Sequence, residues 1–153
     1  MSILARYRKP GGFLQLLKLI ETSQPAKQEK LLDVVEKEDP RWAELIREKK
    51  LTSEMILSWD HSTQATIFEY MVARHCATLF KRMEEGKLVE FRDIFKLEKY
   101  KELHDLVEHM NDPLESEYIA ACNHLLETVR YLDEEKKIIL RFINPILDLE
   151  EAA

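Results

Sequence analysis

The stretch that decides the fold, residues 38–64, reads EDPRWAELIREKKLTSEMILSWDHSTQ. Asp39 can cap a helix and Pro40 suits a first helical position, so a helix is predicted to begin here. Trp42, Leu45 and Ile46 then supply a face that packs on the preceding helix. Asp60 or Ser62 gives a second start signal of the same kind. We therefore predict short helices joined by a tight turn, a structure that needs no reactive group.

Outward from this stretch, the whole 153-residue chain favours helix. Its only glycines are Gly11, Gly12 and Gly86, and residues that keep their side-chain freedom in a helix are abundant. No strand-like alternation is seen, so the fold class is predicted to be all-α. Helices are expected near 11–22, 25–38, 40–50, 52–58, 61–73, 74–85, 87–96, 98–110, 113–132 and 134–149.

Short helices with one apolar side each bury that side by stacking on one another. We therefore expect an armadillo-like right-handed superhelix of short helices. A single four-helix bundle is the alternative, and the many short helices argue against it. The domain organisation predicted is a flexible basic arm over residues 1–9, with Arg6, Arg8 and Lys9, followed by one helical domain over residues 10–153.

Charge and apolar runs exclude some classes of protein. The net charge of -6 disfavours a nucleic-acid binder, which needs clustered basic charge. The longest apolar runs, such as residues 138–140, are far below the roughly 20 residues that cross a bilayer. The first residues lack the long apolar centre of a secretion signal. Cys76 and Cys122 are expected to be free thiols, which favours a cytoplasmic location.

Histidines are the obvious candidates for metal or proton chemistry. None has a glutamate three residues before it, as a carboxylate-bridged di-iron bundle needs. His75 and Cys76 are sequence neighbours, so their side chains face apart on a helix. Three glycines cannot build a phosphate-binding loop. We expect no catalytic residue, no metal and no cofactor; the open alternative is a small helical metalloenzyme that uses His104, Glu108 and His109.

The order E-D-P-x-x-A-x-x-I-R, then T-x-E, then D-x-S-x-Q resembles the flagellar rotor switch protein FliG, in the armadillo-type region that includes the C-terminal domain. The resemblance assigns a structural role to the signature residues Asp39, Pro40, Ala43, Ile46, Arg47, Asp60 and Gln64. Gly11-Gly12 is similar to the family's hinge, and residues 125–135 are similar to its final long helix. The family's N-terminal domain has no counterpart here.

The resemblance implies that a charged helix faces the stator, and it transfers this partner-binding role to Lys81, Lys101, Asp105 and Glu108. Two departures from the family pattern bear on torque generation. His109 replaces one acid of a pair, and residues 111–114 replace a Gly-Pro-Val-Arg turn. A second candidate surface consists of Phe13, Leu16, Leu17 and Ile20, which are expected to cover either the chain's own core or that of a neighbouring copy, giving a homo-oligomer by helix stacking.

The function expected from the sequence is that of a non-catalytic protein–protein interaction module in bacterial motility and chemotaxis. Its partners would be flagellar rotor or stator proteins, and its location the cytoplasmic face of the flagellar basal body. The alternative is a FliG-derived adaptor or scaffold that acts outside the motor.

Overall fold

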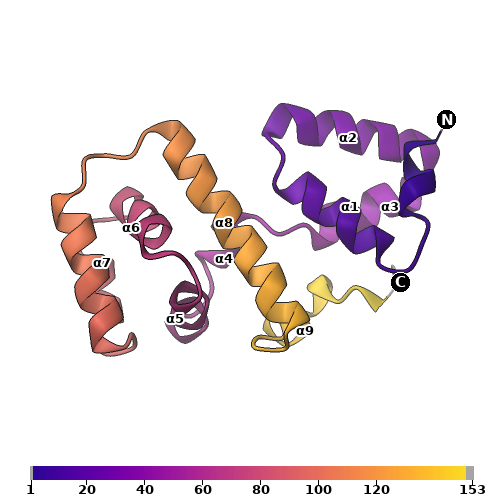
Figure 1. Cartoon of the computed structure of the whole chain (residues 1–153). Helices are drawn as coiled ribbons and strands as arrows, with labels where there is room; N and C mark the ends of the chain where they lie inside the picture. The colour runs from indigo at the N-terminus through magenta and orange to yellow at the C-terminus, as the bar shows by residue number, and fades with distance from the viewer. Residues whose placement is uncertain (1, 151–153) are drawn as a thin grey trace. The chain divides into compact units, whose positions relative to one another are not determined.

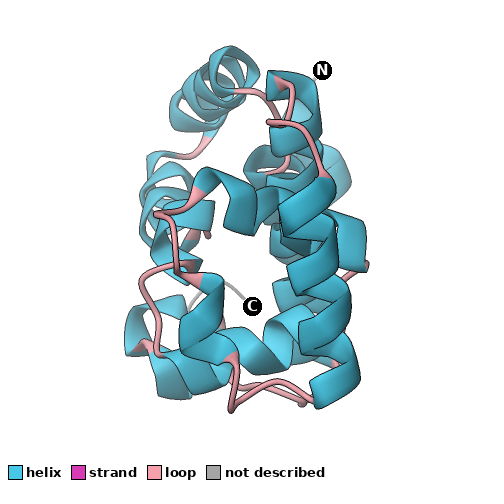
Figure 2. Ribbon diagram, turned by 90° about the vertical axis from the view of Figure 1, so that its left-hand side faces the viewer, coloured by secondary structure: helices cyan, strands magenta, loops and turns pink. Residues whose placement is uncertain are grey.

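The computed structural model describes residues 2–150, and within that range every regular element is a helix (Figure 2). The predicted all-α class is therefore confirmed. Backbone contacts divide the chain into two compact units, the first formed by Met1–Thr52 with Ile139–Ala153 and the second by Ser53–Ile138. This division differs from the single domain expected from residue 10 onward. Met1 and residues 151–153, the extreme ends of the predicted arm and domain, lie outside the described range.

The first unit contains the 3-10 helix η1 (Ile3–Tyr7), α1 (Gly12–Glu21), α2 (Pro25–Glu38) and α3 (Pro40–Lys49), with α9 (Leu140–Ile143) and the 3-10 helix η3 (Pro145–Leu147) from the other end of the chain. Helix α2 packs against α1 and α3 (Figure 1), and backbone contacts also place η3 against α3. The core of the first unit is one apolar cluster contributed mainly by α1, α2 and α3, with Leu4 from η1.

The turn between α2 and α3 consists of one residue. Asp39 ends α2 through its N–H, which donates to Val35 O at 2.7 Å, and its side chain accepts the N–H of Trp42 at 3.1 Å to begin α3. Pro40 follows as the first residue of α3, where the missing N–H costs nothing. Asp39 and Pro40, predicted from the sequence to begin a helix, therefore begin α3.

The second unit contains α4 (Ser53–Ile56), α5 (His61–Glu69), α6 (Ala73–Arg82), the 3-10 helix η2 (Leu88–Phe91), α7 (Leu97–His109) and α8 (Glu115–Glu134). Helix α6 lies between α7 and α8 and packs against both (Figure 1). The interior of the second unit holds a group of phenylalanine rings whose centroids lie 5.2–6.5 Å apart, namely Phe68, Phe80, Phe91 and Phe95. Edge and stacked contacts of this kind add to the burial of apolar area.

Three expected elements differ from the structure. Residues 87–96 form only the short η2 instead of a full helix. The helix expected over 134–149 is wrong, because only the short α9 and η3 form within that range. Lys136, just after the end of α8 at Glu134, adopts a left-handed conformation with φ 59°. Asn144 and Pro145 then begin a new 3-10 helix. The expected flexible arm instead contains η1, whose Leu4 is buried.

Candidate functional site

The charged face of α7 is the first candidate surface. Lys101, Asp105 and Glu108 follow one another at steps of four and three residues, so they lie on one side of the helix, and all three are exposed. The opposite side of α7 carries Leu103, which is fully buried. Packing against α6 therefore fixes the direction in which the three charges point.

Lys81 does not lie on that outer face. Its ammonium group donates a hydrogen bond to Val107 O at 3.1 Å, which ties α6 to α7. It lines a polar cleft of about 690 Å³ in the second unit, together with His104 and Glu108. The four charged residues predicted from the family resemblance are thus divided: Glu108 reaches both surfaces, Lys81 only the cleft, and Lys101 and Asp105 only the outer face.

Two histidines on α7 sit beside acids of the same helix. His104 Nε2 lies 3.6 Å from Glu108 Oε1, and His109 Nδ1 lies 3.1 Å from Asp105 Oδ1. The hydrogen bond from His109 to the Asp105 carbonyl, and then the Asp105 charge, raise the pKa of His109. Residues 2–150 contain no set of three or more His, Cys, Asp and Glu side chains that could hold one metal ion.

The second predicted surface lies inside the protein. Phe13, Leu16, Leu17 and Ile20 form the inner face of α1 and are at most 6% exposed within the chain's own core. This arrangement corresponds to the first of the two alternatives, in which these residues cover the chain's own core. We therefore leave them out of the accessible partner surface.

The signature residues occupy structural positions. Ala43 and Ile46 are fully buried, and Arg47 pairs with Glu36 at 2.6 Å. Asp60 caps α5 by accepting the N–H of Thr63 at 3.1 Å. The buried amide of Gln64 donates to Ile56 O and Trp59 O, which closes the turn before α5. Asp60 and Gln64 therefore hold the backbone, while Ala43, Ile46 and Arg47 contribute core packing and a side-chain ion pair.

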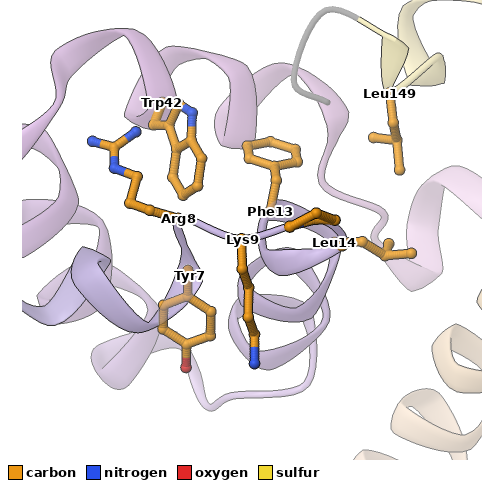
Figure 3. Close-up of a pocket in the computed structure, with 9 residues that line it drawn as sticks. Tyr7, Arg8, Lys9, Phe13, Leu14, Trp42 and Leu149 are labelled. Carbon is orange, nitrogen blue, oxygen red and sulfur yellow. The ribbon is translucent and has the colours of Figure 1, made fainter.

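A pocket of about 630 Å³ in the first unit was not foreseen from the sequence (Figure 3). It lies beside the segment that joins η1 to α1. Aromatic and aliphatic side chains form most of its wall, and two cations lie at it; the lining residues are Tyr7, Arg8, Lys9, Pro10, Gly11, Phe13, Leu14, Trp42 and Leu149.

The end of α2 anchors the segment that forms one side of this pocket. The carboxylate of Glu38 accepts the N–H groups of Ile3 and Leu4, both at 3.1 Å, so that it caps η1 from a distance. Arg8 Nη2 lies 2.7 Å from Asp39 Oδ2. The hydrogen bond from Arg8, with that from the Trp42 N–H, lowers the pKa of Asp39. Two consecutive acids of the α2–α3 junction thus hold η1 at its start, through Ile3 and Leu4, and just after its end, through Arg8.

Two glycines let the chain turn from η1 into α1. Gly11 has φ 80°, a conformation that side chains rarely adopt. A Cβ at Gly12 would lie 1.9 Å from Tyr7 O, so no side chain fits at that position. The close approach brings Tyr7 and Arg8 alongside the start of α1 and shapes the rim of the pocket.

The rings of the aromatic wall contact one another. The rings of Phe13 and Trp42 meet edge to face, with centroids 5.3 Å apart, and the Arg8 guanidinium lies 4.4 Å from the centre of the Trp42 ring (Figure 3). A guanidinium over an indole is the favoured form of cation–π contact. Sequence reasoning missed this site because its parts come from three separate segments; the only local signal was Lys9-Pro10-Gly11-Gly12.

Fold and site together define an all-helical protein with a charged helix face and an aromatic pocket. Every helix in residues 2–150 is too short or too polar to span a lipid bilayer. No family model matches the chain, and a search of curated proteins finds no match either.

Proposed function

We propose that the chain is a non-catalytic protein–protein interaction module, built as an armadillo-like right-handed superhelix, whose working surface is the outer face of α7. The observation that carries this proposal is the exposed row of Lys101, Asp105 and Glu108 on a helix whose other side is buried. A row of this kind keeps a fixed pattern of charge directed at solvent.

Exposed charges of both signs suit recognition that must be specific and easily reversed. Individual exposed ion pairs contribute at most about 1 kcal/mol, while their pattern steers encounter and fixes orientation. A surface with several such charges therefore favours the correct partner and releases it readily. That behaviour fits a contact that is made and broken repeatedly.

The partner is proposed from the resemblance to the flagellar rotor switch family: a rotor or stator protein at the cytoplasmic face of the basal body. A specific observation favours the adaptor outside the motor as the second candidate. Asp105 lies 3.1 Å from His109, the residue that replaces the family's second acid, so the face carries less free negative charge when His109 is protonated.

A charge-reversal experiment tests the interaction function. The variant carries Lys101→Glu, Asp105→Lys and Glu108→Lys on α7. A matched control carries Lys27→Glu, Glu29→Lys and Asp33→Lys on α2, where all three side chains are also exposed and the change in net charge is the same. In a deletion strain we expect the control to restore rotation and the α7 variant to leave assembled but non-rotating flagella.

Photo-crosslinking separates the two candidates. A crosslinking amino acid at position 105 is compared with one at position 29. Crosslinks from position 105 to rotor or stator proteins support the motor function. Crosslinks to other proteins, with unchanged swimming in the deletion strain, support the adaptor. Equal crosslinking from both positions would overturn the interaction function of α7.

A further inference from the structure

The pocket beside the η1–α1 segment is large enough to admit a ligand. Its volume of about 630 Å³ lies in the range of ligand sites, and its wall combines the Phe13 and Trp42 rings with Leu14. The rings are held in place by each other and by Arg8, so the pocket does not depend on a ligand to form. It therefore provides a preformed apolar surface for an inserted side chain.

The chain's own C-terminal segment shows which chemistry suits this wall. Leu149 lines the pocket and is flanked by Asp148 and Glu150. The residues just before this segment are held in place. The Lys49 ammonium donates a hydrogen bond to Ile146 O at 3.0 Å, and Leu147 is buried. An aliphatic side chain between acids thus already lies against the pocket.

The charge at the rim matches such a segment. Arg8 is engaged by Asp39 and by the Trp42 ring, whereas the exposed ammonium of Lys9 makes no ion pair with any residue in the described range 2–150. A carboxylate next to an inserted aliphatic group would meet Lys9.

We propose that this pocket binds an acidic peptide segment of a partner protein, which displaces Leu149, packs an aliphatic side chain on Trp42 and Phe13 and directs its carboxylates at Lys9. The partner segment displaces residues 148–150 because both carry the same chemistry. The proposal rests on residues of the first unit alone and does not depend on the function proposed for α7.

The probe is a synthetic peptide with the sequence of residues 148–153, DLEEAA, added to the ¹⁵N-labelled chain. Leu149→Ser removes the competing aliphatic anchor from the chain itself, and because Leu149 is only partly buried at the edge of the core the variant is compatible with folding. In this variant we expect the peptide to shift the Trp42 indole signal and to leave the Trp59 indole unchanged. Wild-type protein should need a higher peptide concentration for the same shift.

Two controls test the role of charge. Lys9→Glu should weaken peptide binding about three- to fivefold, the effect of one exposed ion pair, whereas Lys27→Glu at the start of α2 should not change it. The charge-swapped peptide KLKKAA should leave Trp42 unmoved. A Trp42 signal that stays fixed with DLEEAA, or that responds equally to both peptides, overturns the proposal.

Sedimentation distinguishes a foreign partner from a second copy of this chain. If wild-type protein dimerises with increasing concentration and Leu149→Ser abolishes the dimer, the occupant is the C-terminal segment of another copy and the partner assignment fails. A wild-type monomer together with the expected peptide shifts supports the partner.

Discussion

The carboxylate of Glu21 accepts a hydrogen bond from the backbone N–H of Leu51 at 2.7 Å, although the two residues lie 30 positions apart. Glu21 ends α1 and is only 4% exposed, and Leu51 follows the end of α3. The buried carboxylate of Glu21 therefore accepts a backbone N–H that lies just beyond the end of α3. This contact fixes the exit from α3.

Replacing Glu21 with Ala should lower the free energy of unfolding by about 1–3 kcal/mol, because the buried N–H of Leu51 loses its acceptor. Glu21→Gln keeps an acceptor oxygen of the same reach and should lose less. Urea denaturation followed by circular dichroism measures both. Equal losses for the two variants would show that the charge, and not the acceptor, is what the site requires.

Gly12→Ala should be more destabilising than Gly11→Ala, although the residues are neighbours. At Gly11 the cost is the left-handed backbone, of order 1–2 kcal/mol, because a Cβ there meets open space. At Gly12 the added Cβ collides with the Tyr7 carbonyl, so residues 7–12 must move. Thermal unfolding compares the variants; an equal decrease in Tm would contradict the close approach.

Cys76 and Cys122 should differ strongly in reactivity. Cys76 is fully buried, and burial raises the pKa of its thiol to about 12, so very little thiolate exists near neutral pH. Cys122 is partly exposed. Iodoacetamide at pH 8 should modify Cys122 at least about 100-fold faster, as intact mass spectrometry can follow. Rapid double modification of the native protein would contradict this prediction, and Cys122→Ser should remove the fast phase.

His124 should make the protein less stable in mild acid. Its Nε2 accepts the Val72 N–H at 3.2 Å and its ring lies 4.7 Å from that of His75. Burial, and then the charge of His75, lower the pKa of His124. The unfolded chain therefore takes up the proton first, and stability decreases as the pH falls below about 6.5 towards the folded pKa.

His109 provides the matched control because its pKa is raised instead. A raised pKa contributes stability that is present below about pH 6.5 and is lost as the pH rises through the folded value. His124→Gln should flatten the acid loss of stability, whereas His109→Gln should steepen it. Urea titrations at several pH values between about 5 and 8 measure both slopes. Slopes that change in the same direction would contradict the assignments.

Helix starts could be predicted from the sequence because their signals are local. Asp39 and Asp60 each satisfy an N–H three residues further on, so a short window of sequence contains both partners. The apolar face of α1 was likewise visible from spacing. What the sequence could not decide was whether that face covers its own core or that of another copy.

The parts that could not be predicted depend on contacts between distant segments. Glu38 caps η1 from 34 and 35 residues away, and Arg8 reaches Asp39 across 31 residues, so an arm that looks disordered by composition is anchored. The pocket combines residues near positions 7–14, Trp42 and Leu149. Lys136 shows the opposite case: a good helix former adopts a left-handed conformation where α8 must end.

The first unit is assembled from two segments that the whole of the second unit separates in sequence, and Lys49 donates a hydrogen bond to Ile146 O across 97 residues. During synthesis on a ribosome, residues 53–138 are made before the second segment of the first unit, which begins at Ile139. The nascent second unit then has all its partners while residues 1–52 still lack Leu140 and Leu147. Completion of the two units therefore runs opposite to the order in which their first residues are translated.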